Sequence, residues 1–140
     1  MSNLTISNFD TETAAEFISD VSLNGYGLIA IAIDRMNEQE VRQTLTDCEE
    51  TLVAAELIAA AIGRPSLHLP EDAREWVATF LPTGSFENDE ITRLADNAAD
   101  AIDKIVADSE LRDMWEGNPD FDEWFQLQVD LQQRILGNED

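Results

Sequence analysis

The sequence has few of the side chains on which catalytic and metal sites usually depend. Its 140 residues include one histidine, His68, and one cysteine, Cys48. Zinc sites combine several Cys and His ligands, and di-iron bundles repeat a Glu-x-x-His pair, so neither is expected. The six glycines form no phosphate-loop or dinucleotide pattern, and no EF-hand calcium loop occurs. We therefore expect no metal ion and no cofactor.

Long apolar runs and basic side chains are also scarce. No run of about 18 apolar residues occurs, so we expect no membrane-spanning helix and no membrane partner. Residues 1–4 show neither the basic nor the apolar region of a signal peptide, and a single cysteine cannot form an internal disulfide. Both observations predict a cytoplasmic location. Eight Lys and Arg oppose 30 Asp and Glu, a net charge of −22. Direct binding to nucleic acid needs clustered cations and is not expected.

The residues that are present predict one helical domain. Hydrophobic residues make up 44% of the chain, enough for a core, and the length of 140 residues suits a single domain over 1–140. Apolar side chains recur at helical spacing in most segments, and Gly, Pro and Asn separate these segments. We predict an all-α bundle of five to seven helices.

A central helix is predicted over about residues 47–62. Thr46 and Glu49 match a capping box at its start, and Gly63 followed by Arg64-Pro65 suits its end. Its Ala, Leu, Val and Ile residues surround almost the whole helix, which indicates burial among neighbouring helices. At the first helix, Asp10 is the predicted N-cap.

Residues 28–36 fit two kinds of secondary structure. Ile29, Ile31 and Ile33 alternate as in a strand, whereas Leu28, Ile29, Ala32, Ile33 and Met36 follow helical spacing. We favour a helix, because no second strand is available for pairing and an isolated strand is unstable.

His68 and Cys48 are the two candidates for catalysis, and both have a simpler explanation. His68 lies in the connecting segment Pro65-Ser66-Leu67-His68-Leu69-Pro70, where we favour a solvated or locally hydrogen-bonded loop residue over a general base. Cys48 would lie in the first turn of the central helix, where the helix dipole lowers a thiol pKa, but spacing identifies no base beside it. No catalytic residue is assigned.

The acidic residues carry the main functional signal. Spread evenly over about 7,000 Å² of surface, 30 carboxylates would lie ~15 Å apart, beyond the ~8 Å Debye length. A helix predicted to follow a cap at Asn88, with an apolar face from Ile91 to Val106, instead spaces Asp96, Asp100 and Asp103 as i, i+4 and i+7, so they share one face. The acids predicted to bind a partner are Asp89, Glu90, Asp96, Asp100, Asp103 and Glu110. The same helix offers two ion pairs at i, i+4, Asp89–Arg93 and Asp100–Lys104.

Several segments resemble a bacterial family known as domain of unknown function 4259. Its members tend to begin with an aromatic, Asn/Asp-capped helix like Phe9-Asp10-Thr11-Glu12-Thr13-Ala14-Ala15-Glu16-Phe17, although the Trp-Gly-x-Gly lead of that family is absent here. Further similarity lies in residues 54–65, in Leu111-Arg112-Asp113-Met114-Trp115, and at Trp124, Leu131 and Arg134. The resemblance implies no established activity and supplies no catalytic residue.

Three functions remain compatible with these observations. The first is a non-catalytic acidic protein that covers the cationic surface of a basic partner, most concretely an immunity protein for a nuclease-type toxin. The second is a DNA mimic that inhibits a DNA-binding protein, and the third is a small enzyme that uses His68 and carboxylates. Adaptation to a salty cytoplasm would also produce such a composition, without any basic partner.

Overall fold

The described part of the chain contains seven helices. The computed structural model describes residues 7–25, 27–38, 44–80 and 88–136, with side chains except at 79, 80 and 88–92. The helices are α1 (Glu12–Asn24), α2 (Gly27–Glu38), α3 (Leu45–Ala61), α4 (Glu71–Phe80), α5 (Asn88–Ala107), α6 (Glu110–Glu116) and α7 (Phe121–Leu136). These residues contain no strand, and the predicted all-α single-domain bundle is confirmed.

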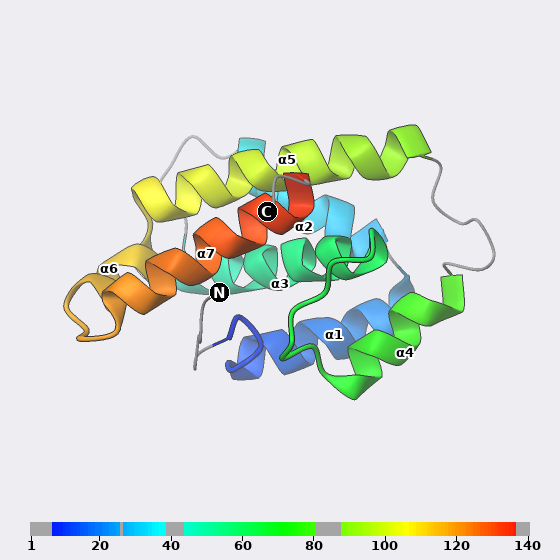
Figure 1. Cartoon of the computed structure of the whole chain (residues 1–140), viewed down its shortest axis with the longest axis horizontal. Coiled ribbons are helices and arrows are strands. Elements are labelled where there is room, and N and C mark those ends of the chain that lie inside the picture. Colours follow the sequence, from blue (N-terminus) through cyan, green and yellow to red (C-terminus); the bar gives the residue numbers. More distant parts are fainter. Residues whose placement is uncertain (1–6, 26, 39–43, 81–87, 137–140) are drawn as a thin grey trace.

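Helix α3 is the centre of the bundle, as its composition predicts. Residues 51–60 are all buried, and α3 contacts each of the other six helices. Figure 1 shows α3 between α5 and α7 on one side and α1 and α4 on the other, with α2 behind it. The alanines of α3, among them Ala54, Ala55 and Ala59, allow these neighbours to approach closely.

The start of α3 differs from the prediction by two residues. Thr44, and not Thr46, is the N-cap, and its hydroxyl accepts a hydrogen bond from the Asp47 amide at 3.3 Å. A residue of α6 stabilises this earlier start, because the carboxylate of Glu110 accepts a hydrogen bond from the amide of Leu45, the first residue of α3, at 3.0 Å. Cys48 therefore lies two residues deeper in the helix than the predicted N-cap implies.

The N-cap of α1 lies one residue after the predicted position. Thr11 caps this helix, since its hydroxyl accepts from the Ala14 amide at 3.0 Å. Asp10 instead accepts from the Ser7 amide at 2.9 Å and closes the turn that precedes the helix. Asp10 and Thr11 both have side chains that can cap a helix, and Thr11 is the cap because Asp10 is used in the preceding turn.

The predicted end of α3 and the helical interpretation of residues 28–36 are both confirmed. Gly63 has φ +91°, and the Arg64 amide donates to the Ala59 carbonyl at 2.8 Å, which is the pattern of a Schellman motif. In α2, Ile29 and Ile33 are buried while Ile31 is 52% exposed. A strand would have placed all three on one face.

The last two helices are joined by a tight turn. Ser109 caps α6 by accepting from the Arg112 amide at 3.1 Å. Asn118-Pro119 belongs to the turn and not to the helix, because the Asn118 side chain accepts from the Asp120 amide at 2.8 Å and α7 begins at Phe121. None of the helices in the described ranges is both long and apolar enough to cross a membrane.

Candidate functional site

The predicted acidic face is present on α5. Leu94, Ala98, Ile102 and Ile105 of this helix are buried against the bundle, as the amphipathic pattern requires. Asp96, Asp100 and Asp103 are exposed on its other side, and we call these three residues the α5 acidic row. Consecutive members lie roughly 4.5–6 Å apart along the helix axis, well below the average spacing of the acids. The charge on this row is therefore locally concentrated.

Of the other three predicted acids, only Glu110 has a described side chain, and it belongs to α6. Asp89 and Glu90 belong to the first turn of α5, but their side chains lie outside the described ones, as does the predicted Asp89–Arg93 pair. Glu110 lies on α6, where one carboxylate oxygen accepts the hydrogen bond from the Leu45 amide. Glu110 thus has a structural contact in addition to its charge.

The predicted Asp100–Lys104 ion pair is absent. Lys104 extends instead toward the end of α2, where its ammonium group donates to the Asn37 carbonyl at 2.6 Å. The Asn37 side chain returns the contact by donating to the Asn97 carbonyl of α5 at 2.9 Å. A carbonyl at a helix C-terminus attracts a cation, so Lys104 fixes α2 to α5 and leaves Asp100 unneutralised.

Other described cations are also used for internal contacts. Arg112 donates through Nη1 to the Val106 and Ala107 carbonyls at 2.8 and 3.0 Å, closing the C-terminus of α5. Its other terminal nitrogen lies 3.8 Å from the carboxylate of Glu116. Arg134 is 6% exposed and enters the core. The few basic side chains therefore do little to neutralise the exposed acids.

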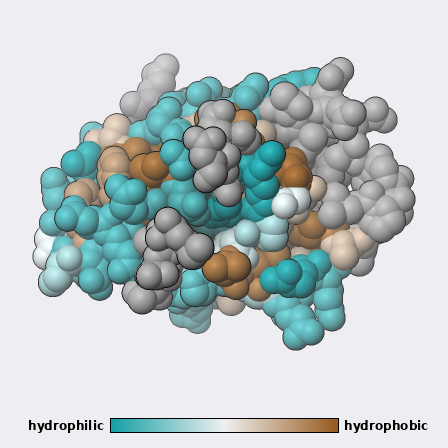
Figure 2. All heavy atoms as spheres, viewed as in Figure 1, coloured by the Kyte–Doolittle hydropathy of each residue, from teal (hydrophilic) through white to brown (hydrophobic). Residues whose placement is uncertain are grey.

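Acidic side chains occur on other helices as well. Hydrophilic residues cover most of the described surface in the view of Figure 2, with small apolar areas between them. Exposed acids of α1, α4 and the α6–α7 region include Glu12, Glu16, Asp20, Glu71, Asp72, Glu75, Asp113, Glu116, Asp120 and Asp122. The α5 acidic row is one part of a broadly anionic surface.

The structure also contains a buried polar cluster that the sequence analysis did not predict. Glu56 of α3 is 1% exposed, and its Oε1 atom lies 3.1 Å from Nη1 of Arg134 on α7. Its Oε2 atom accepts a hydrogen bond from the Asn8 side chain at 3.0 Å. Asn8 in turn exchanges two hydrogen bonds with Gln128 of α7, at 3.1 and 2.9 Å. The cluster ties the N-terminal turn, α3 and α7 together.

Arg134 has further partners that hold its side chain in place. Its Nε atom donates to the Asp130 carboxylate at 2.8 Å, and Nη1 donates to the Arg64 carbonyl at 3.1 Å. The Arg64 side chain donates back to the Arg134 carbonyl at 3.5 Å. The contact of Nη1 with Glu56 Oε1 is an ion pair, and that oxygen has no hydrogen-bond partner among the described residues.

Burial dominates the electrostatics of this cluster. Removal from water raises the pKa of the Glu56 carboxyl above its ordinary value, while the nearby charge of Arg134 and the hydrogen bond from Asn8 act in the opposite direction. One sequence signal points to such a site. A single glutamate in the middle of an otherwise apolar helix needs a buried partner, and Arg134 lies among the apolar positions of the last helix.

The structure separates the two candidate catalytic residues. His68 is exposed in the segment between α3 and α4, and its amide donates to the Ser66 hydroxyl at 3.0 Å. Cys48 is fully buried, and burial raises the pKa of its thiol despite hydrogen bonds with Ser109 and the Leu111 backbone. The expected lowering of that pKa by the helix dipole is therefore wrong. Within the described ranges, no three Cys, His, Asp or Glu side chains are arranged to hold a metal ion.

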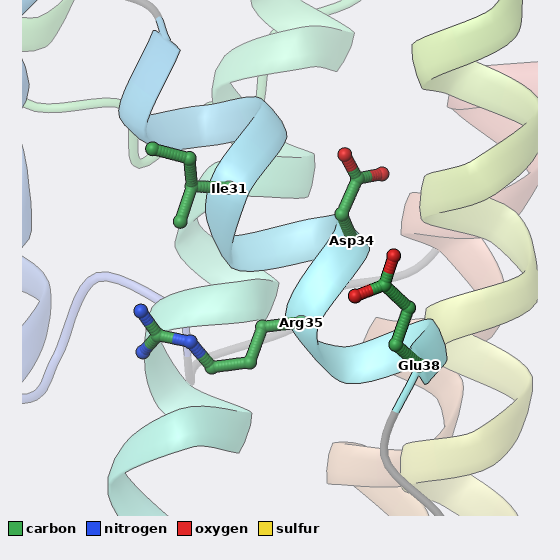
Figure 3. A pocket seen from close by; sticks show the side chains of 4 residues that line it. All are labelled: Ile31, Asp34, Arg35 and Glu38. Atoms are coloured by element: carbon green, nitrogen blue, oxygen red, sulfur yellow. The ribbon is translucent and has the colours of Figure 1, made fainter.

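A depression of about 500 Å³ lies on the outer face of α2, lined by Ile31, Asp34, Arg35 and Glu38. Figure 3 shows the Asp34 and Glu38 carboxylates on the side of α2 toward α5, with Arg35 turned the other way. Arg35 lies 4.0 Å from the Asp47 carboxylate of α3. All four lining residues come from one helix, so this is an open face and not an enclosed ligand site.

Comparison with known proteins gives one match. No curated protein and no solved structure shows significant similarity to the chain. The family model described as domain of unknown function (DUF4259) matches residues 5–126, which include α1 through α6 and the first turns of α7. The match covers most of the 140 residues and agrees with the resemblance seen in the sequence. The chain belongs to the DUF4259 family.

Proposed function

We propose that this chain is a non-catalytic binding protein that covers the cationic surface of a basic protein partner. Its most concrete form is an immunity protein that neutralises a nuclease-type bacterial toxin. The partner-binding surface in this proposal is the α5 acidic row, together with Asp89 and Glu90 at the start of the same helix. In such a complex the carboxylates occupy the positions on the toxin that nucleic-acid phosphates would otherwise take.

One observation carries the proposal, and it concerns Lys104. This lysine follows Asp100 by one helical turn, yet its ammonium group is held by the Asn37 carbonyl at 2.6 Å. Asp96 and Asp100 are exposed and form no ion pair with any described residue. A row of unneutralised carboxylates costs some stability through repulsion, and a cationic partner would remove that cost.

The proposal predicts a strong and local dependence of binding on charge. Attraction between exposed charges is screened by salt, so affinity for a basic partner should fall steeply between about 50 mM and about 500 mM salt. Capture at low salt on the immobilised chain, followed by purification of the captured nuclease in an inactive form, supplies the partner for titration. Protection of a bacterial host that co-expresses the active nuclease tests the immunity function directly.

A pair of matched triple variants shows whether α5 is the binding surface. Asp96→Asn, Asp100→Asn and Asp103→Asn remove three charges from α5, whereas Glu12→Gln, Glu16→Gln and Asp20→Asn remove three exposed charges from α1. Since both sets change the net charge equally, we expect the α5 variant to weaken binding at least about tenfold and the α1 variant no more than about threefold.

Three results would contradict the proposal. A complex that keeps its full affinity in about 1 M salt would not depend on exposed charge. Equal losses in the α5 and α1 variants would mean that only the total charge matters. Recovery of a DNA-binding protein without nuclease activity would favour the DNA-mimic alternative.

A further inference from the structure

A small pocket lies beneath α6, on a part of the molecule that the α5 acidic row does not include. Its volume is about 120 Å³. Four segments line it: the N-terminal turn, the start of α3, α6, and the start of α7. The lining residues are Ser7, Asn8, Asp10, Thr11, Glu49, Leu52, Leu111, Met114, Trp115, Trp124 and Leu127. This volume equals that of about four water molecules and lies well below that of pockets for metabolites, so it suits a single side chain.

The walls of the pocket are apolar and rigidly held. The Trp115 and Trp124 rings stack with centroids 6.3 Å apart, and Phe121 stacks on Trp124 at 5.9 Å. Trp124 is 2% exposed, which anchors this stack in the core. Met114, at the edge of the pocket, is 51% exposed. A preformed aromatic wall with an accessible edge loses little conformational entropy when it receives a ligand group.

The polar groups of the pocket are anionic or already satisfied. The Asn8 side chain is fully used by Glu56 and Gln128, and the Thr11 hydroxyl caps α1. Two carboxylates remain: Asp10, of which one oxygen accepts from the Ser7 amide, and Glu49, which is half-buried and has no hydrogen bond or ion pair with a described residue. No cationic side chain is among the lining residues.

From this combination we infer that the pocket receives a lysine or arginine side chain of a basic protein, with the apolar stem against Trp115 and Leu111 and the cation at Glu49 and Asp10. Long basic side chains combine an apolar stem with a charged end, which matches an apolar wall with an acidic edge. The inference shares with the proposed function only the assumption of a basic partner. It adds an anchoring point apart from α5.

The test is an NMR titration of the whole chain with two capped tripeptides, Gly-Lys-Gly and its norleucine analogue. Norleucine has a similar apolar stem without the charge. We expect the lysine peptide to shift the indole N–H resonance of Trp115, in a manner that added salt suppresses, and the norleucine peptide to shift it little. Trp115→Phe assigns that resonance.

Two variants locate the binding. Glu49→Gln should weaken lysine-peptide binding about tenfold, because a charge-assisted hydrogen bond is lost at a half-buried position. Glu50→Gln is the matched control, since it removes the same charge from the next residue of α3 outside the pocket, and should change binding less than about twofold. Met114→Trp should fill the edge of the pocket and abolish the Trp115 shift. This second variant keeps the inference testable if Glu49→Gln does not fold.

Equal shifts by both peptides, or equal losses in the Glu49 and Glu50 variants, would overturn the inference. Shifts of Trp115 that depend on protein concentration without peptide would instead assign the pocket to a second copy of the chain. The titration needs no natural partner. It can therefore fail while a basic protein still binds α5, and it can succeed if no such protein is found.

Discussion

The carboxylates in the core and those on the outer face of α5 differ in whether a cation lies beside them. Glu56, in the core, lies 3.1 Å from the guanidinium of Arg134 and accepts a hydrogen bond from Asn8. Asp96 and Asp100, on the outer face of α5, are exposed and have no ion pair with a described residue, although Lys104 follows one turn later. Eight basic residues stand against 30 acids, and among the described ones Arg134 is placed in the interior while Asp96 and Asp100 keep an exposed charge.

The largest expected effect comes from removing the cation of the buried cluster. Arg134→Met leaves Glu56 without its charge partner in the core, so the free energy of unfolding should fall by about 3–5 kcal/mol. Urea denaturation followed by circular dichroism measures this change.

A double variant provides the control for that experiment. Glu56→Leu combined with Arg134→Met removes both charges together, and apolar replacements of a buried ion pair are often neutral or stabilising. We expect it to recover most of the lost stability. A double variant as unstable as Arg134→Met alone would show that packing of the arginine stem, and not its charge, is what the fold requires.

The pH dependence of the Arg134→Met variant is the next largest effect. Burial raises the pKa of Glu56, so the folded state favours the protonated carboxyl, and stability from this group declines as pH rises through that range. Loss of Arg134 raises that pKa further. The destabilisation should therefore be smaller near about pH 5 than near about pH 8, by about 1–2 kcal/mol. A difference between wild type and variant that is constant with pH would mean that Arg134 does not alter the pKa of Glu56 in the folded state.

A smaller effect is expected where α5 holds α2. Lys104→Met removes the charge-assisted hydrogen bond to the Asn37 carbonyl, and the free energy of unfolding should fall by about 1–2 kcal/mol. Arg93→Met removes an exposed cation from the same helix and should change stability by less than about 0.5 kcal/mol. Thermal melts of both variants compare them, and equal losses would mean that Lys104 acts only through long-range charge.

The smallest effect should have the opposite sign. Neutralising the α5 acidic row with three asparagines relieves repulsion, and we expect a gain of up to about 1 kcal/mol at low salt that disappears in about 0.5 M salt. Asp103 accepts a hydrogen bond from the Gln132 side chain at 2.8 Å, and the oxygen of an asparagine can accept it as well. A loss of stability at low salt would show that Asp96 and Asp100 also have stabilising contacts in the fold.

The sequence predicts the helical class and the central helix well, because both depend on the periodicity of many residues. Helix starts are predicted less well. Thr44 and Thr46, or Asp10 and Thr11, offer similar capping side chains, and the choice depends on the contact of Glu110 with Leu45 and on the turn closed by Asp10. The contact of Glu110 with Leu45 joins residues that are distant in sequence, and the Asp10 contact closes a local turn. Hydrophobic periodicity predicts neither contact.

The exposed acidic face of α5 is predicted in part. Helical spacing alone places Asp96, Asp100 and Asp103 on one exposed face. The same spacing also pairs Asp100 with Lys104, which is wrong because the carbonyl at the end of α2 is a better-placed acceptor. The Glu56–Arg134 pair spans α3 and α7, and the pocket beneath α6 requires four separate segments. Such groupings follow from the tertiary structure.

The buried cluster also constrains when the chain can complete its folding during synthesis. Asn8 and Gln128 are 120 residues apart in sequence, and Glu56 needs Arg134 from the final helix. During synthesis the first three helices leave the ribosome before α7 does, so until then the Glu56 carboxylate has Asn8 and water but no cation beside it. The interior around α3 is therefore expected to close in one late step, and nascent chains that end before residue 134 should remain loosely folded and sensitive to proteases.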